Sequence, residues 1–379
     1  MGVFVDTGGK SVEFRNFCFD EESSTFKSEV DVNTGLSLSV RAPIVIDNAF
    51  EDKEFFVFLF SKANLVESEI FQVVDKTKNR RVGWCIPVNA LNSNEHSHAS
   101  NVHFWRYAYV AIKFILNSQS AINTKLRFFG DEAPVHIYEL LPESTTIFVV
   151  SKETLDCDFE ISRWIPALAA LGYFQLTSIA PENIRVLRDR VQTPRLEVVP
   201  VSPEISELEQ LTAIYSHAYP FEGNPLFQFF YLYQIVEHLM ELVFKNEQAS
   251  LVQRIISCQQ DVNATKDLLD GAHKNTSEKQ RIKLLVGTYC CCDGGLSEVI
   301  GVCNELLRQL GRDEGTTLDT TLYPIRNFLF HQFRNFPSSA TEPLERVIVS
   351  LSSLLPTLLG NFKNSPVEEL GIPLAQVEA

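Results

Sequence analysis

The sequence has no Cys-x-x-Cys pair, although it contains eight cysteines. Zinc ribbons and thioredoxin-like redox sites need such pairs, so the cysteine spacing argues against both classes. Three cysteines are consecutive at 290–292, and we interpret them as small buried hydrophobes on a helix. A redox or metal site at this triplet is the alternative. The HExxH and GxSxG motifs of zinc proteases and α/β-hydrolases are also missing.

Long apolar runs are missing as well. The most apolar stretches, 55–60 and 227–236, are too short to cross a bilayer. The first ten residues, MGVFVDTGGK, lack the basic region and apolar core of a signal peptide. Asp6 stands where an N-myristoylation motif needs serine or threonine. We therefore expect a cytoplasmic protein that has no membrane partner.

Two ligand-binding motifs are incomplete. The stretch GGKS at 8–11 resembles the end of a phosphate-binding loop, but Phe4 stands where the motif needs its first glycine. His96, His98 and His103 have a spacing that one metal can bridge. His96 and His98 lie in the polar stretch SNEHSHASN, which is typical of a solvated loop. We expect no metal and no cofactor.

Basic residues are outnumbered by acidic ones. The 33 lysines and arginines against 48 aspartates and glutamates give a net charge of −15. This charge argues against a protein that coats nucleic acid nonspecifically, but it allows a small basic site in an acidic frame. The 379 residues are 45% hydrophobic and include 28 phenylalanines, which indicates a globular protein of two or three domains.

The residues that are present predict an α+β protein. The first part of the chain is mixed and strand-rich, and helical periodicity dominates after about residue 200. We therefore expect a mixed α+β domain over 1–198, with a sensing or regulatory role, and an all-α bundle over 199–379. Predicted strands are 55–60, 125–130, 135–140, 145–150 and one within 196–205, with helices at 103–116 and 161–174. Predicted helices of the second part are 204–219, 225–245, 249–270, 276–292, 296–311, 320–335 and 342–360.

The stretch YPIRNFLFHQFRNF at 323–336 places polar residues in an apolar helix. Proline is tolerated in the first turn of a helix, so Pro324 predicts a helix that begins close to it, capped by Asp319 or Thr320. Arg326 and His331 then lie in the first two or three turns, and the free amides of the helix start favour an anion.

Arginine, an amide and histidine together suit the chemistry of a phosphodiester. Arg326 is expected to bind phosphate oxygens, Asn327 shares a face with His331, and His331 is expected to move protons. Such a site can cleave RNA without a metal, by attack of the ribose 2′-OH on the adjacent phosphate. The reaction needs two proton transfers, and one chain supplies one such set. This favours a symmetric homodimer with a composite site.

The stretch Arg326-Asn-Phe-Leu-Phe-His331 resembles the R-x4–6-H motif of HEPN domains, including the polar residue after the arginine. The long aromatic stretch 227–244 contains Glu237, where many such domains carry an acidic residue. The arrangement is similar to proteins of the Apea-like HEPN type over residues 205–360. The resemblance implies a helical bundle that acts as a metal-independent endoribonuclease, leaves 2′,3′-cyclic phosphate ends and works as a toxin or anti-phage, abortive-infection effector.

The resemblance also implies partners. RNA is the expected substrate, and a phage-derived or nucleotide trigger would be sensed by the N-terminal domain. Arg334 is a candidate RNA contact, although a solvated helix end explains it equally well. Phe333 stands where HEPN toxins silenced by nucleotidyltransferase partners often have tyrosine, so that mode of control is not expected.

A non-catalytic reading stays open beside this one. His331 is then a core histidine, Arg326 pairs with a carboxylate, and Glu237 is a structural partner of Arg326 across the bundle. In that case the helical part serves dimerisation, or binds a nucleotide or RNA without cleaving it.

Overall fold

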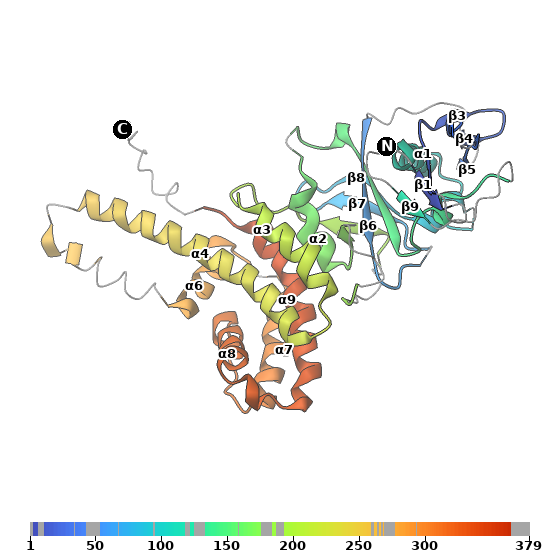
Figure 1. Cartoon of the computed structure of the whole chain (residues 1–379). Helices are drawn as coiled ribbons and strands as arrows, with labels where there is room; N and C mark the ends of the chain where they lie inside the picture. Colours follow the sequence, from blue (N-terminus) through green and yellow to red (C-terminus); the bar gives the residue numbers. More distant parts are fainter. Residues whose placement is uncertain are drawn as a thin grey trace. The chain divides into compact units, whose positions relative to one another are not determined.

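The computed structural model shows a strand-rich first half and a helical second half (Figure 1). It describes residues 3–6, 11–33, 35–42, 54–66, 68–93, 95–117, 122–124, 133–157, 159–175, 184–186, 193–258, 261–263, 265–266, 268, 277–292 and 294–364. The chain divides into two compact units. The first unit comprises Met1–Ile161 and Leu171–Val198, and the second comprises Ser162–Ala170 and Val199–Ala379. The mixed α+β class is therefore as expected, and each unit is described below by itself.

A six-stranded sheet in the order β11-β6-β10-β8-β7-β12 forms the centre of the first unit. Neighbouring strands are antiparallel except for β12 and β7, which are parallel. The strands are β6 Phe55–Ser61, β7 Phe71–Asp75, β8 Arg80–Pro87, β10 Thr145–Ser151, β11 Phe174–Gln175 and β12 Arg195–Val198.

Helix α1, Val102–Asn117, covers one face of this sheet and contacts β6, β8 and β10. Alternate strand residues pack against it, because successive side chains of a strand point to opposite faces. The core between helix and sheet includes Phe55, Val57, Trp84, Ile86, Ile147, Val149, Phe104, Ala108 and Ile112. Gly83 allows β8 to approach β10 closely, since a Cβ atom there would lie 2.0 Å from the carbonyl oxygen of Val149.

Two three-stranded sheets complete the strands described in the first unit. One has the order β2-β1-β9 and the other β3-β4-β5. Their strands are β1 Val3–Asp6, β2 Ser11–Phe14, β9 Ile122–Thr124, β3 Cys18–Asp20, β4 Thr25–Lys27 and β5 Ser39–Arg41.

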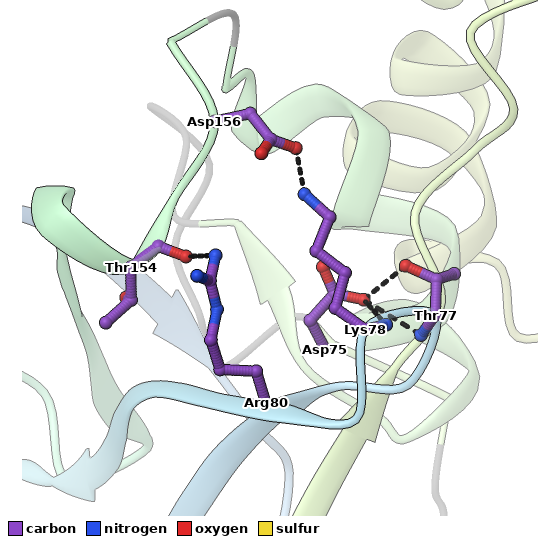
Figure 2. Close-up of polar contacts among 6 residues, drawn as sticks. All are labelled: Asp75, Thr77, Lys78, Arg80, Thr154 and Asp156. Carbon is purple, nitrogen blue, oxygen red and sulfur yellow. Dashed lines mark hydrogen bonds and ion pairs between the residues drawn. The ribbon is translucent and has the colours of Figure 1, made fainter.

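The turn between β7 and β8 is held by polar contacts on both sides (Figure 2). The carboxylate of Asp75 accepts hydrogen bonds from the Thr77 amide at 2.9 Å and from the Thr77 hydroxyl at 2.6 Å. Lys78 in the turn pairs with Asp156, and Arg80 at the start of β8 donates to the carbonyl oxygen of Thr154. Lys78 and Arg80 therefore fasten this turn to the segment after β10.

The second unit consists of packed helices. Helix α7 lies between α8 and α9 and contacts both, while α4 contacts α9 and α6 (Figure 1). The helices are α2 Ile165–Ala170, α3 Leu208–Ala213, α4 Pro225–Ser257, α6 Glu278–Leu284, α7 Leu296–Gln309, α8 Leu318–His331 and α9 Thr341–Asn361. Within the described ranges, no helix is long and apolar enough to cross a membrane.

Several predicted elements of the first half differ from the structure. Residues 55–60, 145–150 and 103–116 form the expected strands and helix, but 135–140 contains the 3-10 helix Ile137–Glu139 instead of a strand. Strands β7 and β8 were not predicted, and the strand expected at 125–130 lies outside the described residues. The helix expected over 161–174 ends at Ala170 and belongs with the second unit, where α2 contacts α9.

In the second half, the two helices expected at 225–245 and 249–270 form one helix, α4, up to Ser257. No glycine or proline interrupts it between 246 and 250, so the predicted break was wrong. The side chain of Asn224 caps its start by accepting from the amide of Leu226 at 3.0 Å. The π-helical turns Ile214–Ala218 and Leu285–Tyr289 follow α3 and α6.

Candidate functional site

Helix α8 begins earlier than the sequence predicted. Its first residue is Leu318, and Pro324 is the seventh residue rather than part of the first turn. Thr317 is the N-cap, and its amide donates to the hydroxyl of Thr320 at 3.0 Å. This reciprocal cap starts the helix nearly two turns before the proline and stabilises a start that Pro324 alone would not indicate. The predicted cap at Asp319 or Thr320 is therefore wrong.

This earlier start changes what surrounds Arg326. Arg326 is the ninth residue of α8 and His331 is its last. The free backbone amides of the helix start therefore lie more than a turn away from Arg326, and they do not supply the anion site expected from the sequence. Any attraction for phosphate must come from side chains.

Arg326 joins α8 to two other helices through carboxylates. Its Nη2 donates to Glu237 Oε1 on α4 at 3.2 Å, and its Nε lies 3.4 Å from Glu278 Oε1 on α6. Its Nη1 also donates to Asn327 Oδ1 at 3.3 Å. The Arg326–Glu237 pair suggested for the non-catalytic reading is thus present, and Asn327 orients the guanidinium. We refer to Arg326, Asn327, Glu237, Glu278 and Tyr233 as the Arg326 cluster.

Tyr233 completes the cluster from α4. Its hydroxyl donates to Glu278 Oε1 at 2.6 Å, so this carboxylate oxygen serves both Tyr233 and Arg326. Burial, followed by the hydrogen bond to Glu278, raises the pKa of Tyr233 well above its usual range. Tyr233 therefore remains a neutral donor and holds Glu278 in place.

The guanidinium of Arg326 also lies over two aromatic rings. Its Cζ is 4.5 Å from the ring centre of Phe330 and 5.8 Å from that of Tyr233. Burial by itself lowers the pKa of Arg326, but the hydrogen bond to Glu237 and the charge of Glu278 outweigh it, so the pKa rises above its ordinary value. Arg326 is a permanent cation whose side chain is 20% exposed.

His331 and Arg334 lie outside this network. Both are exposed, and in the described part of the chain neither side chain makes a hydrogen bond or ion pair. Arg334 belongs to the 3-10 helix Phe333–Asn335 that follows α8. The structure therefore brings Arg326, Asn327 and Glu237 together, and it leaves His331 at the open end of the same helix.

For two of the residues around Arg326 that were not predicted, Tyr233 and Phe330, the sequence contains an indication in the helical spacing. Tyr233 lies four residues before Glu237, and Phe330 lies four residues after Arg326, so each pair shares a helix face. Glu278 has no such signal, because only packing brings α6 beside α8.

The arrangement can bind an anion, with a constraint. One cation faces two carboxylates, so a phosphate must compete with Glu237 and Glu278 for Arg326. Each terminal nitrogen of a guanidinium carries two hydrogens, which leaves one on Nη1 and one on Nη2 for a ligand. No group of three or more histidine, cysteine or acidic side chains in the described ranges has a geometry that suits a metal ion.

His96 and His98 lie in a loop of bends and turns, as expected, but their side chains are not fully solvated. Both rings are half-buried, and the ring of His98 lies 4.8 Å from that of Trp84 and 6.0 Å from that of Phe104. The Nδ1 of His96 accepts a hydrogen bond from the His98 amide at 3.2 Å. They pack as aromatic side chains beside the core of the first unit.

Comparison with known proteins gives no relative for either unit: no family model, no curated protein and no solved structure matches this chain.

Proposed function

We propose that the second unit is a metal-independent endoribonuclease of the HEPN type, active as a homodimer with a composite site and serving as a defence or growth-arrest effector. The observation that carries the proposal is that one helix, α8, holds Arg326, which the cluster orients, and the exposed His331 five residues later. Arg326 is oriented by Asn327 and Glu237 and keeps two free N–H donors for phosphate oxygens. His331 is exposed and free to meet a substrate.

The division of roles follows from the surroundings of each side chain. Arg326 is held on three sides, which suits a group that stabilises charge developing on a phosphate. His331 is unrestrained, which suits a group that accepts or donates a proton. Because each chain has one His331, the second proton transfer is assigned to the His331 of a second copy.

A non-catalytic role is the second candidate, and the carboxylates of the cluster favour it. Glu237 and Glu278 already neutralise Arg326, as expected of a network that fastens α4, α6 and α8 together. In this reading the unit serves dimerisation, or binds a nucleotide or RNA without cleaving it.

Cleavage of total RNA in EDTA distinguishes the two candidates. We expect the wild-type protein to cut RNA and to leave 2′,3′-cyclic phosphate ends. Loss of a general acid–base group lowers rates by about 10²–10⁴-fold, so His331→Ala should be slower by this factor. His217→Ala is the matched control, because His217 is another exposed histidine of the second unit and should have no effect.

The result has clear alternatives. Equal cleavage by wild type and His331→Ala would rule out the assigned chemistry. If neither protein cuts RNA, while both fold and Arg326→Ala abolishes binding of a nucleotide or RNA, the result rejects a constitutive nuclease and favours the non-catalytic candidate or a dormant effector that awaits its trigger.

A further inference from the structure

Phenylalanine rings stand at the surface beside the Arg326 cluster. Phe227 on α4 is 46% exposed and Phe330 on α8 is 44% exposed. Phe230 links them, with ring centres 5.9 Å from Phe227 and 4.4 Å from Phe330. We call these three rings the stacking platform.

The platform is joined to a cation. The guanidinium of Arg326 lies over the ring of Phe330 at 4.5 Å, and its side chain is still 20% exposed. Arg334 is exposed four residues after Phe330, and Phe333 between them is 50% exposed. Aromatic rings interleaved with arginines are typical of surfaces that bind single-stranded nucleic acid, where bases stack on rings and cations hold the phosphates.

We infer that the stacking platform binds unpaired bases of single-stranded RNA and thereby sets the phosphate at Arg326. The inference rests on the proposed function and names its substrate class. A base on Phe330 lies on a ring that already touches the guanidinium, so its own phosphate is within reach of the free N–H donors of Arg326. Bases in a duplex are stacked on one another and cannot use the rings, so duplex RNA is a poor ligand.

Charge favours RNA over a second copy of the chain as the occupant. The chain carries a net charge of −15, and Arg326 is already shared between Glu237 and Glu278, but residues 331–336 directly after Phe330 contain no carboxylate and carry the exposed cation of Arg334. A polyanion is attracted to Arg334, and its bases cover the rings.

The test measures binding with RNA that cannot be cut. Fluorescein-labelled oligoadenylates of about ten nucleotides with 2′-O-methyl riboses lack the attacking hydroxyl, so wild-type protein can be titrated by fluorescence anisotropy at one salt concentration. The comparison strands are an abasic strand of the same length and the duplex with oligouridylate. We expect the single strand to bind about 5- to 150-fold more tightly than the abasic strand.

Substitutions of Phe330 test whether its aromatic ring causes the preference for the strand that carries bases. Phe330→Leu should remove most of the preference for bases, and Phe330→Tyr should retain it. Ile256→Ala is the matched control, because Ile256 is an apolar residue that is 61% exposed and lies roughly 40 Å further along α4.

Equal binding of the oligoadenylate and the abasic strand, or an unchanged preference in Phe330→Leu, would overturn the inference. A change from dimer to monomer in Phe330→Leu by light scattering would assign the rings to a contact between copies instead. If wild type and Phe330→Leu each cleave single-stranded and duplex RNA at equal rates, the base-binding role of the stacking platform is rejected, but the proposed nuclease activity is not. If wild type binds the single strand preferentially but cleaves no RNA, the proposed nuclease activity is rejected, but the base-binding role of the stacking platform is not.

Discussion

The buried ion pair between Lys62 and Glu69 offers a quantitative test of the first unit. Lys62 follows β6, and its Nζ lies 2.8 Å from Glu69 Oε2, with side-chain exposures of 3% and 5%. The Nζ is also 5.0 Å from the ring centre of Tyr173. Burial removes both charged groups from water, so each is stabilised mainly by the opposite charge of the other.

Removal of one partner should be costly. Lys62→Met leaves the carboxylate of Glu69 buried without its cation, and Glu69→Gln leaves the ammonium of Lys62 buried without its anion. Each change should lower the free energy of unfolding by about 3–5 kcal/mol. The double variant Lys62→Met/Glu69→Leu removes both charges and keeps the volume, so it should unfold within about 1–2 kcal/mol of wild type.

An exposed pair of the same unit is the control. Arg106 and Glu54 are 2.7 Å apart, but their side chains are 38% and 51% exposed. Water already solvates and screens these charges, so Glu54→Gln should cost less than about 1 kcal/mol.

Urea unfolding followed by tryptophan fluorescence measures these differences. The chain has three tryptophans, and Trp164 is the one in the second unit. In a Trp164→Phe background, fluorescence therefore reports the unfolding of the first unit through Trp84 and Trp105. A loss of 3–5 kcal/mol corresponds to a midpoint lowered by about 1–2.5 M urea. A single variant whose free energy of unfolding lies within about 1 kcal/mol of the background would refute this reasoning. A double variant that loses as much free energy of unfolding as the two single variants together would also refute it.

Two further predictions concern titratable groups. Burial, followed by the charge of His96, lowers the pKa of His98, so the folded protein favours the neutral ring. Stability is then complete above the unfolded pKa of about 6.5 and is lost as the pH falls from there through the lowered folded-state value. The melting temperature of wild type should drop more than that of His98→Phe between about pH 7.5 and about pH 5.5, and parallel curves would contradict this. Iodoacetamide should label the folded protein at exposed thiols only, as shown by peptide mapping, and equal labelling of all the thiols would contradict the burial. Exposed thiols are Cys18, Cys157 and Cys291, and buried thiols whose pKa burial raises to about 12 are Cys85, Cys290 and Cys303.

Local sequence patterns predicted much of the fold. The β-branched and aromatic runs at 55–60 and 145–150 form β6 and β10, and the apolar spacing over 103–116 forms α1. Their patterns reflect interactions within a few residues, so they can be recognised without the rest of the chain. The run at 135–140 has similar composition, but Val135 forms an isolated bridge with Val40 and Ile137–Glu139 form a 3-10 helix.

The stretch around Pro324 shows the limit of such reasoning. A proline in the seventh position of a helix leaves one carbonyl without its usual donor and costs about 3 kcal/mol in an isolated helix. Helix α8 keeps it because the cap at Thr317 fixes the start and because α6 and α7 pack against α8. The local cost of Pro324 follows from the sequence, whereas this packing depends on helices that the sequence does not place beside it.

The sequence by itself determined the two-part α+β organisation, most helices of the second half and the choice of Arg326, Asn327 and His331 as candidates. It also suggested the pairing of Arg326 with Glu237. Only the tertiary structure added Glu278 and Tyr233, neutralised Arg326 with two carboxylates, and left His331 exposed at the end of its helix. The physical reason is distance along the chain: Arg326 and Glu237 are 89 residues apart, Glu278 and Tyr233 are 45 apart, and only the packing of α4, α6 and α8 brings them within hydrogen-bonding reach.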